Sequence, residues 1–206
     1  MITNETLKGE LLAQIPEISG AFHFIRQIDE WPEQVSLQAC IDLLFDGTPE
    51  RCEKLRQKNC RLIIINSVLY TLGESDNKFI RINAWPGFLQ RNIVEASSGE
   101  DELRAEAEQL FSSIGKSTTW VPDICGFISA RVVVTIINEA FYSLEENISS
   151  EKEIDTAMKL GTNYPFGPFE WASKIGVKNV HELLRKLSAD EHRYLPCKLL
   201  EKKALA

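Results

Sequence analysis

The sequence predicts an α/β domain followed by an all-helical domain. Short runs of branched apolar residues alternate with helical patterns in the first part of the chain. The segment 39–68 has the order strand, helix, strand, which is the βαβ pattern of a parallel sheet with a helix on its face. Beyond Val121 no strand pattern occurs. We therefore expect an α/β domain at residues 1–121 and a helical domain at residues 122–206.

The α/β part contains six candidate strands and three candidate helices. We expect strands at 21–28, 39–45, 62–68, 79–85, 93–96 and 117–121. We expect helices at 3–18, 50–58 and 100–114. Thr48 can cap the second helix, and Pro49 fits its first turn because the missing N–H would be unpaired there anyway.

The helical part begins with a predicted helix at 127–146, whose apolar stripe consists of Val133, Ile137, Ala140 and Leu144. Ser150 and Glu153 form a possible capping box for the next helix. That helix leads into a turn in which Gly161 is expected as a left-handed C-terminal cap and Pro168 as the first residue of another helix. Further helices are expected at 181–187 and 194–203.

Composition and charge exclude several functional classes. The chain has 206 residues, 44% hydrophobic and 26% charged, as an ordinary globular protein has. Its net charge is −7 and its Lys and Arg residues are scattered, so nucleic acid is not an expected partner. Five cysteines without a CxxC pair and three separated histidines predict reduced thiols and no metal site. No signal peptide or membrane span is visible, so we expect a soluble cytoplasmic protein.

The turn between the helices carries a family resemblance. The run Lys-Leu-Gly at 159–161, Asn-Tyr-Pro at 163–165 and Gly-Pro-Phe-Glu at 167–170 resembles the C-terminal helical domain of 3-hydroxyacyl-CoA dehydrogenases. Residues 125–131 look like the opening of that domain, and Asn-Glu-Ala at 138–140 like the middle of its first helix. The resemblance covers most of residues 62–175. It implies a truncated Rossmann-like, mainly parallel sheet followed by a helical domain of the 6-phosphogluconate dehydrogenase C-terminal-like kind.

A Rossmann domain binds the dinucleotide pyrophosphate at a G-x-G-x-x-G turn. None of the eleven glycines here forms a G-x-G. The α/β part resembles only the second half of a Rossmann domain, from Ala39 onward, and residues 1–38 have no predicted role. We therefore expect no cofactor-binding residues and no cofactor, or NAD if the chain is an active dehydrogenase.

The resemblance also identifies the catalytic positions. In the family a histidine removes the substrate hydroxyl proton, and a glutamate from the next strand orients it, which suits imidazole because its pKa lies near neutral pH. Here Asn83 stands at the histidine position and Glu95 at the glutamate position. Glu95 is the candidate catalytic residue, although it could instead pair with Arg81 or Arg91. Asn83 could be a turn-side amide bonded to backbone.

The resemblance implies further substrate-binding positions. Ala130 replaces an asparagine of the family, and Val68 replaces a serine, although Ser67 is adjacent. Asn163, Pro165 and Phe166 would line an acyl-CoA cleft together with Ser67 and Asn83. His23 is an alternative base from elsewhere in the fold.

These positions favour a degenerate 3-hydroxyacyl-CoA dehydrogenase homologue that binds an acyl-CoA-like ligand. The alternative is an active NAD-dependent 3-hydroxyacyl-CoA dehydrogenase of fatty-acid metabolism. A third hypothesis is a non-catalytic interaction module, because the family's helical domain forms a homodimer and the stripe of Val133, Ile137 and Leu144 could do so here. A homodimer through the helical domain is expected, and no membrane partner.

Overall fold

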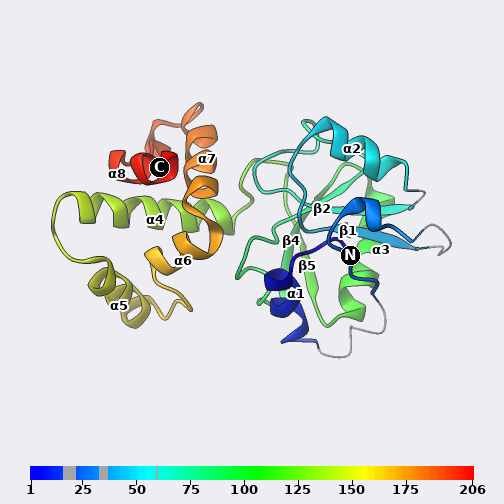
Figure 1. The fold of residues 1–206 in the computed structure, drawn as a ribbon, viewed down its shortest axis with the longest axis horizontal. Helices are drawn as coiled ribbons and strands as arrows, with labels where there is room; N and C mark the ends of the chain where they lie inside the picture. The colour runs from blue at the N-terminus through cyan, green and yellow to red at the C-terminus, as the bar shows by residue number, and fades with distance from the viewer. Residues whose placement is uncertain (16–21, 33–36, 59) are drawn as a thin grey trace. The chain divides into compact units, whose positions relative to one another are not determined.

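The computed structural model describes residues 1–15, 22–32, 37–58 and 60–206. The chain divides into two compact units, Met1–Phe127 and Ile128–Ala206, and most of their helices and strands are labelled in Figure 1. Residues 122–127 stay with the first unit, because the N–H of Gly126 donates to the carbonyl oxygen of Val68 at 2.8 Å.

The first unit is built on a five-stranded sheet with the order β1-β2-β3-β4-β5. The strands are β1 (Ala39–Asp42), β2 (Leu62–Asn66), β3 (Ile80–Ile82), β4 (Ile93–Ser98) and β5 (Ser117–Trp120). All neighbours are parallel except β3 and β4. An antiparallel pair needs no crossover helix, so the short connection 83–92 suffices there. The predicted class, a mainly parallel α/β sheet followed by helices, is confirmed.

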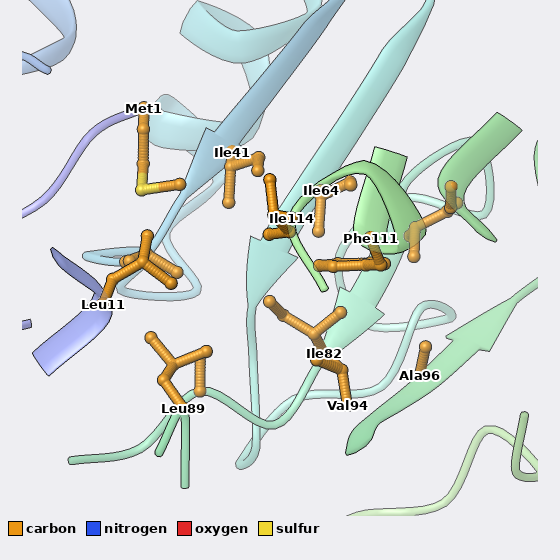
Figure 2. Close-up of a cluster of buried hydrophobic side chains, with 14 of the residues drawn as sticks. Met1, Leu11, Ile41, Ile64, Ile82, Leu89, Val94, Ala96, Phe111 and Ile114 are labelled. Atoms are coloured by element: carbon orange, nitrogen blue, oxygen red, sulfur yellow. The ribbon is translucent and has the colours of Figure 1, made fainter. Parts of the chain in front are cut away.

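Helices cover both faces of this sheet. Ile64 of β2 belongs to the core cluster that includes residues of α1 (Glu5–Leu12) and α3 (Asp101–Ser113), among them Leu11 and Phe111 in Figure 2. Ile63 and Ile65 belong to the other cluster, with residues of α2 (Pro49–Arg56). Alternate residues of a strand point to opposite faces, so a strand covered on both faces is apolar throughout. This is why the run Leu-Ile-Ile-Ile forms β2.

The strand predicted at 21–28 is wrong. Ile25 makes only an isolated bridge with Ile2, and Ile28–Glu30 form the 3₁₀ helix η2. The N–H of Arg26 donates to the Glu30 carboxylate at 2.9 Å, which closes a turn instead of pairing with a strand. The first predicted helix ends at Leu12; the expected end near Pro16 and the start of the predicted strand at residue 21 lie outside the described residues.

The second unit consists of α4 (Ser129–Glu145), α5 (Glu151–Thr162), α6 (Pro168–Ile175), α7 (Val177–Ser188), the 3₁₀ helix η3 (His192–Tyr194) and α8 (Lys198–Leu205). α4 contacts α6, α7 and α8 and buries Ile137 and Phe141. The predicted helix at 194–203 begins later, at Lys198. Leu195 is extended because it precedes a proline, which disfavours helical backbone.

The left-handed cap of α5 is Asn163 and not Gly161, so that prediction is wrong. Gly161 lies inside α5, whereas Asn163 has φ 55°. The helix continues to Thr162, and asparagine tolerates the left-handed conformation that must follow. The predicted capping box of Ser150 and Glu153 is confirmed.

A buried carboxylate of α5 caps the start of α6. The Asp155 carboxylate accepts the N–H groups of Phe169 at 2.8 Å and Glu170 at 3.2 Å. Pro168 is the first residue of α6, as predicted. A Cβ on Gly167 would lie 2.3 Å from an oxygen of Asp155. Gly167 is therefore required for close approach between the two helices.

None of the helices in the described part of the chain is both long enough and apolar enough to span a membrane.

Alanine substitutions at the two glycines should have opposite effects on the free energy of unfolding. Gly161→Ala should raise it by about 1 kcal/mol, because alanine favours a helix interior and no described atom lies within 4 Å of the added carbon. Gly167→Ala should lower it by about 1–3 kcal/mol, because the added carbon collides with Asp155. Urea unfolding measures both, and a destabilised Gly161→Ala would restore Gly161 as the left-handed cap.

Candidate functional site

Asn83 and Glu95 form a buried cross-strand pair. Asn83 follows β3, and the antiparallel register, with Ile82 opposite Ala96, places it beside Glu95 of β4. The backbone N–H of Asn83 donates to the Glu95 carbonyl at 3.1 Å, and its Nδ2 donates to Glu95 Oε2 at 3.0 Å. The residues are 3% and 5% exposed. Glu95 is therefore a buried carboxylate bonded to an amide.

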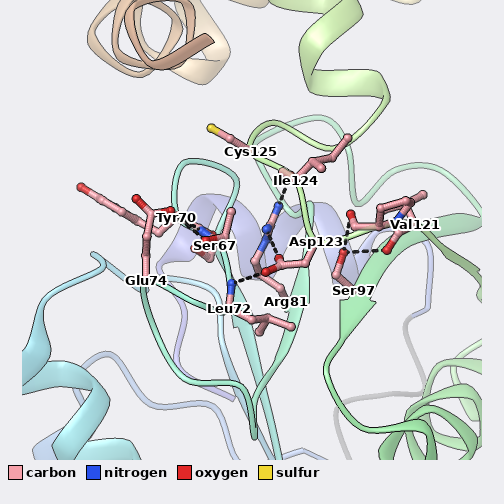
Figure 3. A network of polar contacts seen from close by, with 12 residues as sticks. Ser67, Tyr70, Leu72, Glu74, Arg81, Ser97, Val121, Asp123, Ile124 and Cys125 are labelled. Atoms are coloured by element: carbon pink, nitrogen blue, oxygen red, sulfur yellow. Dashed lines mark hydrogen bonds and ion pairs between the residues drawn. The ribbon is translucent and has the colours of Figure 1, made fainter. Parts of the chain in front are cut away.

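One alternative from the sequence was an ion pair between Glu95 and Arg81. In the structure the ion-pair partner of Arg81 is Asp123. Its fully buried guanidinium donates to the Asp123 carboxylate and, at 2.7 Å, to the carbonyl of Ile124 (Figure 3). The ring of Phe127 lies 4.2 Å from the guanidinium carbon. Burial lowers the pKa of Arg81, and the adjacent Asp123 carboxylate opposes that shift. The ion pair attaches residues 123–127 to β3.

Asn66, at the end of β2, connects the carboxyl ends of three strands. Its Nδ2 donates to the carbonyls of Leu43 at 3.2 Å and Ala84 at 3.3 Å. Its Oδ1 accepts the N–H of Ala84 at 2.9 Å. The sequence contains no local signal for this role, because the partners come from segments about twenty residues away in either direction, which only the sheet order brings together.

The hydroxyl of Ser67 is used within its own loop. Ser67 Oγ donates to the carbonyl of Tyr70 at 2.8 Å (Figure 3). The backbone N–H of Ser67 donates to the carbonyl of Ile82. Val68, at the position of the family serine, is buried. The structure therefore brings the backbone of Ser67 next to β3, but its hydroxyl bonds to Tyr70.

The other predicted substrate-binding residues belong to the second unit. Ala130 is fully buried in the first turn of α4. Asn163 is the exposed left-handed residue after α5, and Pro165 is exposed in the loop that follows. The Phe166 ring meets the Trp171 ring edge-on, with centroids 4.9 Å apart. His23 of the first unit has an exposed side chain, unlike the buried Asn83 and Glu95.

The loop after Asn83 is held by residues that the sequence did not single out. The N–H of Gly87 donates to the Glu10 carboxylate of α1 at 2.8 Å. The buried Lys116 ammonium donates to the carbonyls of Leu89 at 2.7 Å and Arg91 at 2.9 Å, and to the Gln14 side chain at 3.1 Å. Burial lowers the pKa of Lys116. The N-terminal segment thus supports the loop beside the pair, a role that no local pattern predicted.

Comparison with known proteins finds similarity to dehydrogenases that act on 3-hydroxyacyl-CoA compounds, by their names. The family described as 3-hydroxyacyl-CoA dehydrogenase, C-terminal domain, matches residues 126–206. A probable 3-hydroxybutyryl-CoA dehydrogenase of Deinococcus radiodurans is 30% identical over 95% of this chain and 75% of its own length. The 3-hydroxyadipyl-CoA dehydrogenase of Escherichia coli is 38% identical over 55% of this chain, which is 24% of that protein.

The fold has a similar solved relative. The crystal structure of (S)-3-hydroxybutyryl-CoA dehydrogenase from Ralstonia eutropha has a TM-score of 0.69 and 25% identity, covering 87% of this chain and 68% of that chain. The match to the probable 3-hydroxybutyryl-CoA dehydrogenase of Bacillus subtilis spans 39% of that protein. The chain thus spans less than half the length of several relatives that it matches.

The expectation that no cofactor is used is wrong at the level of the family. The matching proteins are dehydrogenases, and members of this family depend on NAD. The expectation rested on the missing G-x-G turn in a chain that corresponds to only part of several relatives. The first helix of the chain, α1, does not begin with such a glycine turn. It begins after Asn4, whose side-chain oxygen accepts the backbone N–H of Leu7.

Removal of the carboxylate that faces Arg81 should destabilise the first unit strongly. Asp123→Ala should lower the free energy of unfolding by about 3 kcal/mol or more, because it leaves a buried guanidinium without its counter-charge. The matched control is Asp29→Ala, whose exposed carboxylate lies 3.7 Å from Lys54 and which should cost about 0.5 kcal/mol or less. Urea unfolding compares the two; equal losses would mean that Arg81 does not need Asp123.

Proposed function

Because the chain belongs to the 3-hydroxyacyl-CoA dehydrogenase family, we propose that it binds an acyl-CoA-like ligand with the acyl group beside Asn83 and Glu95. The observation that carries the proposal is the 3.0 Å hydrogen bond between the side chains of Asn83, which follows β3, and Glu95 of β4. The family resemblance puts the histidine and its glutamate at these two positions, and the burial and contact of the two side chains support the proposal. Ser67 is proposed as a further contact of the ligand, and Ala130, Asn163, Pro165 and Phe166 stay predictions of the family resemblance.

The same pair supports the proposal that this site is degenerate. Removal of a hydroxyl proton needs a base whose protonated form is stable near neutral pH. The amide of Asn83 is neutral and has no accessible protonation step, and Glu95 is committed to orienting it. Val68 and Ala130 lack the polar groups that the resemblance places there. The proposed role is ligand binding without proton transfer at this pair.

Binding can be tested by thermal unfolding of the whole chain with CoA or acetoacetyl-CoA in large excess. A ligand at about a hundredfold excess over its Kd stabilises by about 2.7 kcal/mol, a shift of several degrees for a chain of this size. We expect the shift with acetoacetyl-CoA to exceed that with CoA. If neither ligand produces a shift, the binding proposal fails.

Turnover distinguishes the alternative. NADH oxidation with acetoacetyl-CoA that is lost in Glu95→Gln would establish an active dehydrogenase and contradict the degenerate site.

A homodimer through the second unit is a further proposal, and α4 supports it in a modified form. The predicted stripe includes Ile137, which is fully buried, but Ile128 and Val132, one turn apart, are 55% and 50% exposed. Exposed apolar neighbours of this kind suit a protein contact. Sedimentation velocity at micromolar concentration should show a dimer that Val132→Glu weakens, with Thr156→Glu, at an exposed position on α5, as the control. A monomeric wild-type chain would refute the dimer.

A further inference from the structure

One oxygen at the candidate site lacks a hydrogen-bond donor. Asn83 Oδ1 is buried, and no described residue donates to it. The nearest backbone donor along the chain, the N–H of Ala84, is already bonded to Asn66 Oδ1. A buried acceptor without a donor is costly, so an unsatisfied group in a native protein calls for an explanation, and a bound molecule that donates a hydrogen bond is one.

The orientation of this oxygen is fixed by Glu95. Asn83 Nδ2 donates to the side-chain oxygen of Glu95, which turns the NH₂ group of the amide toward the Glu95 carboxyl group. Rotation of the amide by half a turn would place the Asn83 oxygen against the Glu95 carboxylate. The 3.0 Å contact between Asn83 Nδ2 and Glu95 Oε2 therefore leaves Oδ1 as the atom of the amide without a donor among the described residues.

We propose, on the basis of the acyl-CoA binding proposed above, that Asn83 Oδ1 selects the hydroxyl form of the ligand over the oxo form. A 3-hydroxyacyl group can donate its O–H to this oxygen. A 3-oxoacyl group offers only a carbonyl oxygen, which would face another acceptor.

An imidazole at this position could serve both forms. Neutral imidazole accepts from an alcohol, and protonated imidazole donates to a ketone. The amide held by Glu95 can only accept at this face, so it favours one oxidation state of the ligand. The chain would then retain 3-hydroxyacyl-CoA in preference to 3-oxoacyl-CoA.

Isothermal titration calorimetry of the full chain with three CoA thioesters tests this selection. We expect 3-hydroxybutyryl-CoA to bind about tenfold more tightly than acetoacetyl-CoA, since a hydrogen bond left unmade in a buried site weakens binding on that scale. Butyryl-CoA should also bind less tightly than the hydroxy form. Equal affinity for the hydroxy and unsubstituted forms would mean that a water molecule satisfies Asn83 Oδ1, and this would overturn the proposal.

Asn83→Leu removes the acceptor at similar side-chain size and should bring the ratio of hydroxy to oxo affinities to about one. The matched control is Asn92→Leu at an exposed position just before β4, which should leave the ratio unchanged. The wild-type comparison is decisive even if Asn83→Leu does not fold. A ratio that persists in a folded Asn83→Leu would assign the preference to other residues.

The outcomes separate this inference from the proposal on which it rests. If none of the three thioesters binds, both fail. If all three bind with equal affinity, acyl-CoA binding stands and the selection by Asn83 is refuted.

Discussion

The buried ion pair between Arg81 and Asp123 is the contact on which the organisation of the first unit most depends. A guanidinium without solvent needs a counter-charge and hydrogen-bond acceptors, and residues 123–124 supply both. Ser97, opposite Arg81 on β4, donates to the carbonyl of Val121 at 2.9 Å (Figure 3). The segment that follows β5 is thereby attached to β3 in the middle of the sheet. The attachment point, Arg81, lies two residues before Asn83 in the chain.

The candidate pair is supported from two further directions. Asn66 joins the ends of β1, β2 and β3, and α1 with Lys116 holds the loop that follows Asn83. Each support uses a side chain that bonds to backbone groups which strand pairing leaves unused. The amide of Asn83 is thus placed on a constrained backbone. This keeps its side-chain oxygen in a fixed direction, as the proposed selection between hydroxyl and oxo ligands requires.

Much of the candidate site followed from sequence. The positions of Asn83 and Glu95 on successive strands came from the family resemblance, and an antiparallel register was the one further condition for their contact. The partner of Arg81 was not predictable, since Asp123 is separated from it by β4, α3 and β5. The sequence around Ser67 did not distinguish a hydroxyl that binds substrate from one that bonds within its own loop. Its bond to Tyr70 depends on the path of the loop backbone.

The sequence by itself determined the order of elements from Ala39 onward, because apolar periodicity, caps and prolines act over a few residues. It determined the βαβ pattern, the capping box at Ser150 and the start of α6 at Pro168. Only the tertiary structure decided which residue takes the left-handed turn after α5, what neutralises Arg81, and which face of the Asn83 amide remains without a donor. These depend on groups brought together from distant segments, where burial makes each hydrogen bond and charge consequential.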